Sequence, residues 1–400
     1  MRFRVTMQAL LDAWTYLSKV VVARALYDGV EITAEGDTLT LVHSDLEVGV
    51  RVSIPNVEIS EEGKAFFQLK SLMDSMREFK KDSLIEISTK VDAVNPAKVL
   101  VYSKLEGGAS GTINGQTKNP NDLFEMVNDV PLQEFVVSQR LLKRGISNTL
   151  FALSSGIKPQ NAALNAVFVE IGQGTIRFLG TSLNHFATYA FTHQDTGDIE
   201  TQLKIPQRSA SILESMLKEL ADSEAKIFFN KGLLRVETED FSFVTRQKDD
   251  EYPDFKNMYI SKENAKEVIV PRSLLHEGAS YANNYVGQKG VAGVITVKDN
   301  MIYLAVDDGM SKAHYSTHCT MMFEGEYTIG CRFDTVITAC SHIESQDVNI
   351  LFPEIPGQPA YFYPTQNSEE NVSFEQILAT NATQPNVTAL PPEEKPTEQE

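Results

Sequence analysis

The chain repeats one order of hydrophobic and polar positions three times. In each copy, a short alternating run typical of a strand leads into a stretch whose apolar residues fall on one helical face. The strand-like runs are Phe3–Val5, Phe135–Val137 and Val268–Val270. The helical faces begin at Leu10, Leu141 and Leu274, which lie 131 and then 133 residues apart. This regular spacing predicts three tandem copies of one structural unit.

Each copy continues with two strand-like runs joined by a polar turn, and then with a second amphipathic helix. The paired runs are Val30–Ile32 with Leu39–Val42, Val167–Ile171 with Ile176–Leu179, and Val294–Val297 with Ile302–Val306. The six predicted helices cover Gln8–Lys19, Lys70–Lys81, Ser138–Thr149, Gln207–Leu220, Pro271–Val286 and Arg332–Ile343. Because each helix has one apolar stripe, it must lie on a sheet with its other face in water.

The pattern therefore predicts an α+β fold of three tandem domains, each with two helices packed on antiparallel sheets. An ordinary α+β core explains each helix taken singly, but it does not explain the threefold spacing. Polar segments punctuated by proline, at residues 119–131 and 252–264, separate the copies. We predict domains at residues 1–131, 132–262 and 263–378. Residues 379–400 have no aromatic side chain, and we expect them to form a disordered acidic tail.

Composition narrows the class of protein. The formal charge is −18, which excludes a chain coated with positive charge but not one basic face on an acidic body. Three cysteines (Cys319, Cys331 and Cys340) make a disulfide framework improbable, so a reducing bacterial cytoplasm is expected. The longest apolar runs fall far short of the roughly 20 residues that a membrane span needs. We expect neither a secreted nor a membrane protein.

No motif predicts an active site. The segment 172–174 (Gly-Gln-Gly) lacks the third glycine of a nucleotide-binding loop and lies between two predicted strands, so it reads as a hairpin turn. A metal site is the alternative for one set of side chains: His314, His318, Cys319, Cys331, Cys340 and His342. Their spacing lacks the close cysteine pairs of structural zinc sites, and Cys340 belongs to an apolar helix stripe. We expect no metal, no cofactor and no enzymatic activity.

The predicted helices carry the positive charge of the chain. Together they sum to +5, which leaves −23 for the remainder. A basic helical face suits contact with DNA phosphates regardless of sequence. The alternative is that Lys and Arg occur there because they are good helix formers.

Several strings, in order along the chain, complete a pattern. His43–Glu47 is similar to a Thr-Asp-Leu-Glu element, and Leu164–Ile171 resembles a strand that begins Leu-Asn-Gly. Thr181–Ala187 stands in place of Thr-Asp-Gly-His-Arg-Leu-Ala, and Glu251–Phe255 in place of a Gly-Arg-Phe-Pro-Asp-Tyr turn. With Met1–Val5 at the start, these strings resemble the bacterial DNA polymerase sliding clamp, the β subunit of the replicative polymerase. The resemblance covers residues 1 to about 378.

The resemblance implies a homodimeric ring whose helices line a hole that holds duplex DNA. It also implies two protein partners, the replicative polymerase that the clamp tethers and an ATP-driven clamp loader. No nucleotide site and no membrane contact are expected, and a nucleoid-associated protein in the bacterial cytoplasm is implied. The family's final Met-Pro-Met-Arg-Leu strand has no clear match, and Val372–Leu378 is the substitute. This divergence and the additional tail suggest a clamp of a bacteriophage or another mobile element.

Two sets of site residues follow. Family correspondence and helix placement together predict DNA contacts from Arg24, Lys70, Arg77, Arg140, Lys143, Lys158 and Arg208. A groove for partner peptides is expected at Leu164, Thr181, Leu183, His185, Phe186, Pro253 and Met258. The alternative for the groove set is that these residues only pack a domain junction. His185 stands where the family has Arg, so we expect its polar contact to strengthen as the pH falls towards about 6.

Two other classes of protein stay open at this point. A duplicated α+β enzyme would need a pocket of convergent polar groups, which the sequence does not indicate. A viral structural or assembly protein built from repeats would form large oligomers without DNA.

Overall fold

The computed structural model describes residues 1–20, 29–45, 47–91, 98–105, 108–116, 133–153, 164–182, 184–193, 199–220, 223–249, 264–285, 292–355, 357–367 and 371–381. By mutual contacts the chain divides into two compact units. The first unit comprises residues 1–143 and 203–249, and the second comprises residues 144–202 and 250–400. The division into three sequence domains stays a prediction.

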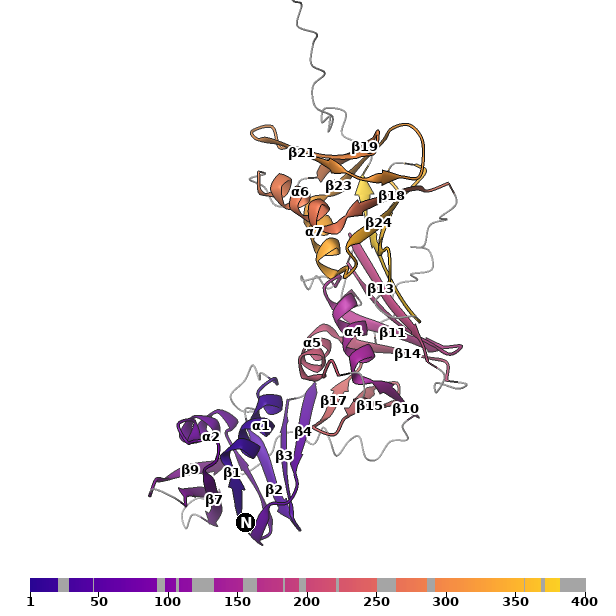
Figure 1. Cartoon of the computed structure of the whole chain (residues 1–400). Coiled ribbons are helices and arrows are strands. Elements are labelled where there is room, and N and C mark those ends of the chain that lie inside the picture. Colours follow the sequence, from indigo (N-terminus) through magenta and orange to yellow (C-terminus); the bar gives the residue numbers. More distant parts are fainter. Residues whose placement is uncertain are drawn as a thin grey trace, which may run out of the picture. The chain divides into compact units, whose positions relative to one another are not determined.

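The described residues contain a helix at every position where the sequence predicts one (Figure 1). The helices are α1 (Met7–Leu17), α2 (Leu69–Met76), α4 (Gln139–Leu150), α5 (Gln207–Met216), α6 (Arg272–Asn284) and α7 (Phe333–His342). Two of them, α2 and α5, end four or five residues earlier than predicted. In α5 the cause is local, because the backbone of Leu217 is already extended (ψ 142°).

The strands alternate with these helices in the predicted order. The first thirteen are β1 (Arg2–Thr6), β2 (Val30–Glu35), β3 (Thr38–Ser44), β4 (Val48–Ile54), β5 (Glu58–Glu61), β6 (Gly63–Phe67), β7 (Leu84–Val91), β8 (Lys98–Lys104), β9 (Ser110–Gln116), β10 (Gln133–Ser138), β11 (Ala166–Gly172), β12 (Thr175–Thr181) and β13 (His185–Thr192). The others are β14 (Thr201–Pro206), β15 (Glu224–Phe229), β16 (Leu233–Glu237), β17 (Ser242–Arg246), β18 (Lys266–Pro271), β19 (Ala292–Lys298), β20 (Met301–Asp307), β21 (Lys312–His318), β22 (Thr320–Met321), β23 (Tyr327–Arg332), β24 (Asp347–Phe352), β25 (Ala360–Pro364), β26 (Val372–Leu378) and β27 (Thr380–Asn381).

Helix α1 shows how the apolar stripe works. Met7, Leu10, Trp14 and Leu17 are buried at helical spacing, and the helix packs on β4 and β3. The side-chain oxygen of Thr6 accepts a hydrogen bond from the backbone N–H of Ala9 (3.3 Å), which satisfies one free donor at the helix start. Burying such a stripe against a sheet is the main stabilising contribution of a helix this short.

Within the first unit, antiparallel strands form a continuous sheet in the order β10-β15-β16-β17-β4-β3-β2-β6-β9-β8-β7-β1-β5. Within the second unit, β11-β12-β13-β26-β25-β24-β18-β22 are neighbours, and a further sheet has the order β21-β20-β19-β23-β27. The predicted strand pairs are confirmed as β2 with β3, β11 with β12, and β19 with β20. The expected hairpin at residues 172–174 is also confirmed, with positive φ at Gln173 (51°) and Gly174 (70°).

Each unit contains one place where strands from distant parts of the chain join two halves of a sheet. In the first unit β4 pairs with β17 over four residue pairs, which we name the first junction. In the second unit β13 pairs with β26 over seven residue pairs, which we name the second junction. The substitute for the missing carboxy-terminal motif, Val372–Leu378, is therefore a strand of the second junction.

The ordered part of the chain extends beyond the predicted boundary at residue 378. Thr380 pairs with Cys331, and Asn381 pairs with Gly330, both on β23. The expected tail thus begins too early at residue 379, because two small polar residues complete a sheet edge that their composition does not indicate. In the part of the chain that the structure describes, no helix has the length and apolar character to cross a bilayer.

Candidate partner groove and nucleic-acid interface

Four of the seven predicted groove residues lie among the described residues, and all four are buried. Leu164 precedes β11, Thr181 ends β12, and His185 and Phe186 begin β13. Leu183, Pro253 and Met258 lie outside the described residues. The turn between β12 and β13 is held by Ser182, whose side-chain oxygen accepts from the backbone N–H of His185 at 3.2 Å.

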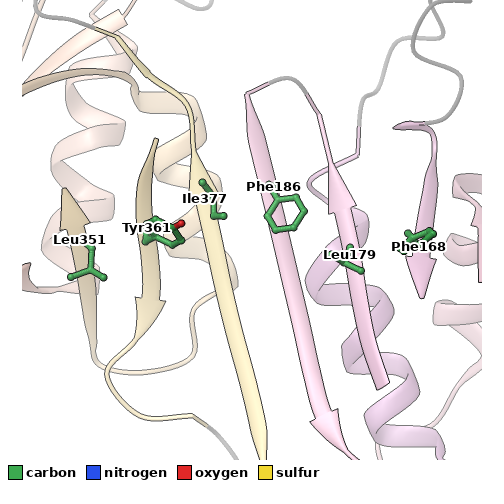
Figure 2. Packing of buried hydrophobic residues seen from close by; sticks show 6 residues of the cluster. All are labelled: Phe168, Leu179, Phe186, Leu351, Tyr361 and Ile377. Carbon is green, nitrogen blue, oxygen red and sulfur yellow. The ribbon is translucent and has the colours of Figure 1, made fainter. Parts of the chain in front are cut away.

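Phe186 belongs to a continuous hydrophobic cluster across the second junction. Six neighbouring strands contribute one residue each, and Figure 2 shows these side chains in a row across the sheet. We name this row the apolar belt: Phe168, Leu179, Phe186, Ile377, Tyr361 and Leu351. Phe186 lies directly opposite Ile377, so the belt crosses from β13 to β26 without a break. All six side chains are between 0 and 8% exposed.

Sequence reasoning found Phe186 but missed four members of the belt: Phe168, Leu179, Tyr361 and Leu351. Phe168 and Phe186 each belong to a string that carries the family resemblance, so alternation along β11 was a usable signal. Tyr361 and Leu351 join the belt only through the register of β24, β25 and β26.

His185 points to the opposite face of the sheet from Phe186, because neighbouring residues on a strand alternate. Its Nε2 lies 2.8 Å from Oε1 of Gln376, and the Gln376 side chain donates to the backbone oxygen of Ala339 on α7 (3.0 Å). The ring also lies edge-on to Phe151, with centroids 5.2 Å apart. This polar chain ties β13 to β26 and β26 to α7.

The expected strengthening of the His185 contact as the pH falls towards 6 is wrong. Burial lowers the pKa of His185 to about 4, and the neighbouring His342 adds a smaller effect in the same direction. The ring therefore remains neutral at pH 6, and it donates to Gln376 through its single N–H. Burial likewise lowers the pKa of His342, whose ring stacks on Phe151 at a centroid distance of 3.6 Å.

The first junction has different side chains at the positions of the belt. The paired registers of the two sheets align Phe168 with Glu31, Leu179 with Val42, Phe186 with Gly49, Ile377 with Val244, Tyr361 with Arg235, and Leu351 with Phe228. Glu31 pairs with Lys64 (2.8 Å), and the Arg235 guanidinium lies 4.3 Å from the centre of the Phe228 ring. Only one of these two junctions thus carries a continuous apolar row.

The predicted DNA-contact residues divide into two groups by their surroundings. Lys70 and Arg77, at the two ends of α2, are exposed. Arg208 forms ion pairs with Asp45 (2.6 Å) and Glu47 (3.7 Å). These pairs compensate the Arg208 charge within the first unit.

On α4, the predicted contacts Arg140 and Lys143 are half-buried. Lys143 donates from Nζ to the backbone oxygen of Leu217 (3.0 Å), which satisfies a carbonyl beyond the last turn of α5. Lys143 therefore has a structural contact of its own. Arg24 and Lys158 lie outside the described residues.

The side chains considered for a metal site do not come together among the described residues, where no cluster of three His, Cys, Asp or Glu has suitable geometry. Cys319, Cys331 and Cys340 are buried and unpaired with one another. Burial raises the pKa of Cys319 to about 11 and the pKa of both Cys331 and Cys340 to about 12. These thiols are therefore protonated and poor metal ligands at neutral pH.

Known proteins resemble this chain in both sequence and fold. Residues 1–102 match the family model "DNA polymerase III beta subunit, N-terminal domain". The Beta sliding clamp of Pseudomonas aeruginosa is 27% identical over 284 residues, which cover 70% of this chain and 73% of that protein. The Beta sliding clamp of Halalkalibacterium halodurans is 22% identical over 370 residues, covering 88% and 93%.

Solved structures extend the likeness to nearly the whole chain. A DNA polymerase sliding clamp from Pseudomonas aeruginosa has a TM-score of 0.85 at 20% identity, covering 96% of this chain and all of that one. The DNA polymerase III beta subunit of Thermotoga maritima has a TM-score of 0.80 at 17% identity, with the same coverage. The fold is the mixed α+β sliding-clamp fold. From the sequence match and the fold together, the chain is a sliding clamp of the DNA polymerase III beta-subunit type.

Proposed function

We propose that two copies of this clamp close head to tail around duplex DNA and tether a replicative polymerase to it. The helices line the hole, an ATP-driven loader opens the ring, and the clamp itself catalyses no reaction. The observation that carries this proposal is a turn that occurs three times but forms a junction only twice within one chain.

The first two turns belong to the two junctions. Asp45 Oδ1 accepts from the backbone N–H groups of Glu47 and Val48, both at 2.8 Å. Ser182 Oγ accepts in the same way from Asn184 (3.4 Å) and His185 (3.2 Å). At each junction the incoming strand then donates to the turn.

These donations have the same length at both junctions. The backbone N–H of Arg246 donates to the oxygen of Glu47, and that of Ala379 donates to the oxygen of Asn184, both at 3.0 Å. Arg246 and Ala379 each stand at the end of the strand that joins the turn's own strand.

The third turn has the same bonds and a free strand after it. Asp308 Oδ1 accepts from the backbone N–H groups of Met310 (2.9 Å) and Ser311 (2.7 Å). The strand that follows, β21, pairs with β20 alone among the described strands. Met310, which stands where Glu47 and Asn184 stand, is 96% exposed. An open strand edge of this kind is a site for pairing with another chain.

The strand that fits this edge is β9. It stands in the first copy of the repeat where β17 and β26 stand in the other two, and it follows β8 as they follow β16 and β25. Within the described strands, residues 110–114 of β9 pair only with β8. Both existing junctions give the same register when transferred, which places Thr112 opposite Lys312 of a second copy and Asn114 at the Met310 oxygen.

An aromatic residue on the preceding helix supports the same assignment. At the first junction, Tyr16 of α1 contacts Phe241 just before β17, with ring centroids 5.2 Å apart. The corresponding residue of α6, counted from the buried leucines Leu10 and Leu275, is Tyr281. Tyr281 is 43% exposed, so its ring is available to a second copy.

Cysteine pairing tests the register. Thr112 and Lys312 are both exposed, and the three native cysteines are buried, so a T112C/K312C double variant should form disulfide-linked dimers on mild oxidation. The matched control is N114C/K312C, which uses an exposed residue on the same strand two positions out of register. Equal cross-linking of both variants, or none in either, would contradict the proposed junction.

For the tether, we propose that the apolar belt forms the floor of the partner-peptide groove. Few buried hydrophobic contacts dominate the binding energy of such peptides, and the belt is absent from the first junction, where Glu31, Gly49 and Arg235 interrupt it. For DNA, the exposed Lys70 and Arg77 are the best-placed contacts among the described residues. Arg24, Arg140, Lys143, Lys158 and Arg208 stay predictions.

We further infer that the clamp works at the nucleoid in a bacterial cytoplasm and derives from a bacteriophage or another mobile element. Its low identity to the curated clamps supports this origin. A gene neighbourhood of chromosomal replication genes would contradict it.

A further inference from the structure

The buried His43 has a backbone carbonyl oxygen at each of its two ring nitrogens. The ring is 1% exposed, at the end of β3 in the first unit. Nδ1 lies 2.8 Å from the oxygen of Gly29, and Nε2 lies 3.0 Å from the oxygen of Val20. Both distances are those of N–H···O hydrogen bonds.

A neutral imidazole cannot make both bonds. It carries one N–H and one bare nitrogen, whereas the imidazolium carries two N–H groups. With a neutral ring, one of the two carbonyl oxygens faces a nitrogen lone pair, and a buried carbonyl without a donor is costly. The arrangement therefore fits the protonated ring.

The two oxygens are held in place independently of His43. The N–H of Val20 donates to the oxygen of Leu17 at the end of α1 (3.2 Å). A Cβ on Gly29 would lie 2.1 Å from the ring of Phe66, so this position accepts only glycine at its present approach. The acceptors thus converge on the ring because the surrounding structure fixes them.

The elements around the ring present no charge to it. The residues directly opposite on β2 and β4 are Val30 and Val50, both buried. Of the charged groups on these elements, Glu31 pairs with Lys64, and Arg51 alternates to the face opposite Val50. On α1, Asp12 and Lys19 are exposed. On the turn after β3, Asp45 pairs with Arg208, so the two carbonyl oxygens are the polar partners of the ring.

We propose that His43 is a positioning residue whose imidazolium form donates to Val20 and Gly29 and so fastens both ends of the chain segment between them. This segment carries Arg24, so the inference rests on the proposed function where it concerns DNA. Proton loss from His43 releases one end, and the segment then exchanges its amide hydrogens faster.

Hydrogen exchange on the full-length clamp without DNA tests the fastening. After correction for the intrinsic pH dependence, protection of peptides covering residues 17–30 should fall about tenfold from about pH 6 to about pH 8. His43→Phe should give the low protection at both pH values. Val30→Ala is the control, because it removes neighbouring core atoms but keeps both carbonyls and the imidazole.

Selective ¹⁵N labelling of histidine should show both His43 ring nitrogens protonated at the lower pH. Detection of a single ring N–H at every pH from about 5 to 8, or protection that is the same for the parent and His43→Phe at both pH values, overturns the proposal. Retention on circular DNA separates the two levels: His43→Phe should shorten it as Arg24→Ala does. Altered exchange with unaltered retention in both variants would uphold the fastening and refute the DNA role of Arg24.

Discussion

The two junctions of this chain share one backbone plan but have different side chains on the sheet face. Each has a capped turn, an incoming antiparallel strand and a donation to the turn at 3.0 Å. The second junction adds the apolar belt, whereas the first has Glu31, Gly49 and Arg235 at the corresponding positions. Since the first junction forms without such a row, backbone pairing and the turn are sufficient to join the sheet. The belt is therefore available for a further role, which we assign to partner binding.

The electrostatics of the two junctions also differ. At the first, burial and the neighbouring Arg235 lower the pKa of Arg51, so two cations share the sheet face. At the second, the pair of His185 and Gln376 is buried on the helix side. The difference teaches that the repeat conserves geometry, while each copy has its own polar contacts.

The largest expected effect is the loss of an aromatic ring from the belt. Phe186→Ala should lower the free energy of unfolding of the second unit by about 3–5 kcal/mol, because it removes a buried side chain and leaves a cavity. Val42→Ala, at the first-junction position that corresponds to Leu179, should cost about 1 kcal/mol or less, since Val42 is smaller and half-buried. Hydrogen exchange resolved to each unit measures both. Equal costs would remove the energetic distinction between the junctions.

Acid should weaken the second junction before the first. In the folded protein burial holds the pKa of His185 at about 4, below its ordinary 6.5, so the unfolded chain binds a proton more readily. The stabilisation is complete above about pH 6.5 and is lost as the pH falls towards 4, by at most about 3 kcal/mol. His185→Val, which copies Val48 of the first junction, should flatten this pH dependence. An unchanged acid profile in that variant would show that His185 is not its source.

A graft between the junctions separates binding from folding. Tyr361→Arg places in the belt the side chain of the corresponding Arg235. It should weaken binding of the tail peptide of the cognate polymerase about thirtyfold, equivalent to about 2 kcal/mol, while the chain remains a dimer. Fluorescence anisotropy measures the binding, and light scattering the assembly. Parental affinity in this variant would exclude the belt from the groove.

The turn caps should differ by a smaller margin. Asp45→Ala removes a carboxylate that accepts two N–H groups at 2.8 Å and pairs with Arg208, so a cost of about 1–2 kcal/mol is expected. Ser182→Ala removes a hydroxyl at 3.2 and 3.4 Å and should cost about 0.5–1 kcal/mol. Urea denaturation resolves the two. The reverse order would mean that the Arg208 pair contributes nothing.

Local patterns in the sequence predicted the helices and strand pairs correctly. A helix stripe such as Leu10, Trp14 and Leu17 is a property of neighbouring residues, so it is visible without the fold. The belt is different, because Phe186 and Ile377 meet only when strands 191 residues apart pair in one register. No periodicity within either strand reports that pairing.

The pH expectation for His185 failed for a related reason. The family comparison correctly placed the residue at the start of β13, but its face was not considered, although alternation with Phe186 was a usable signal. The convergence of two carbonyls on His43 had no such signal, since Val20 and Gly29 approach the ring only through the packing of α1 and Phe66.

Topological retention on DNA tests the central claim most directly. The T112C/K312C clamp, oxidised in the presence of nicked circular DNA, should stay bound in about 1 M salt, where phosphate contacts are screened, and should leave when the circle is cut. Reduction of the disulfide should also release it. Loss from intact circles in high salt, at the rate seen with linear DNA, would show that the locked protein does not encircle the duplex.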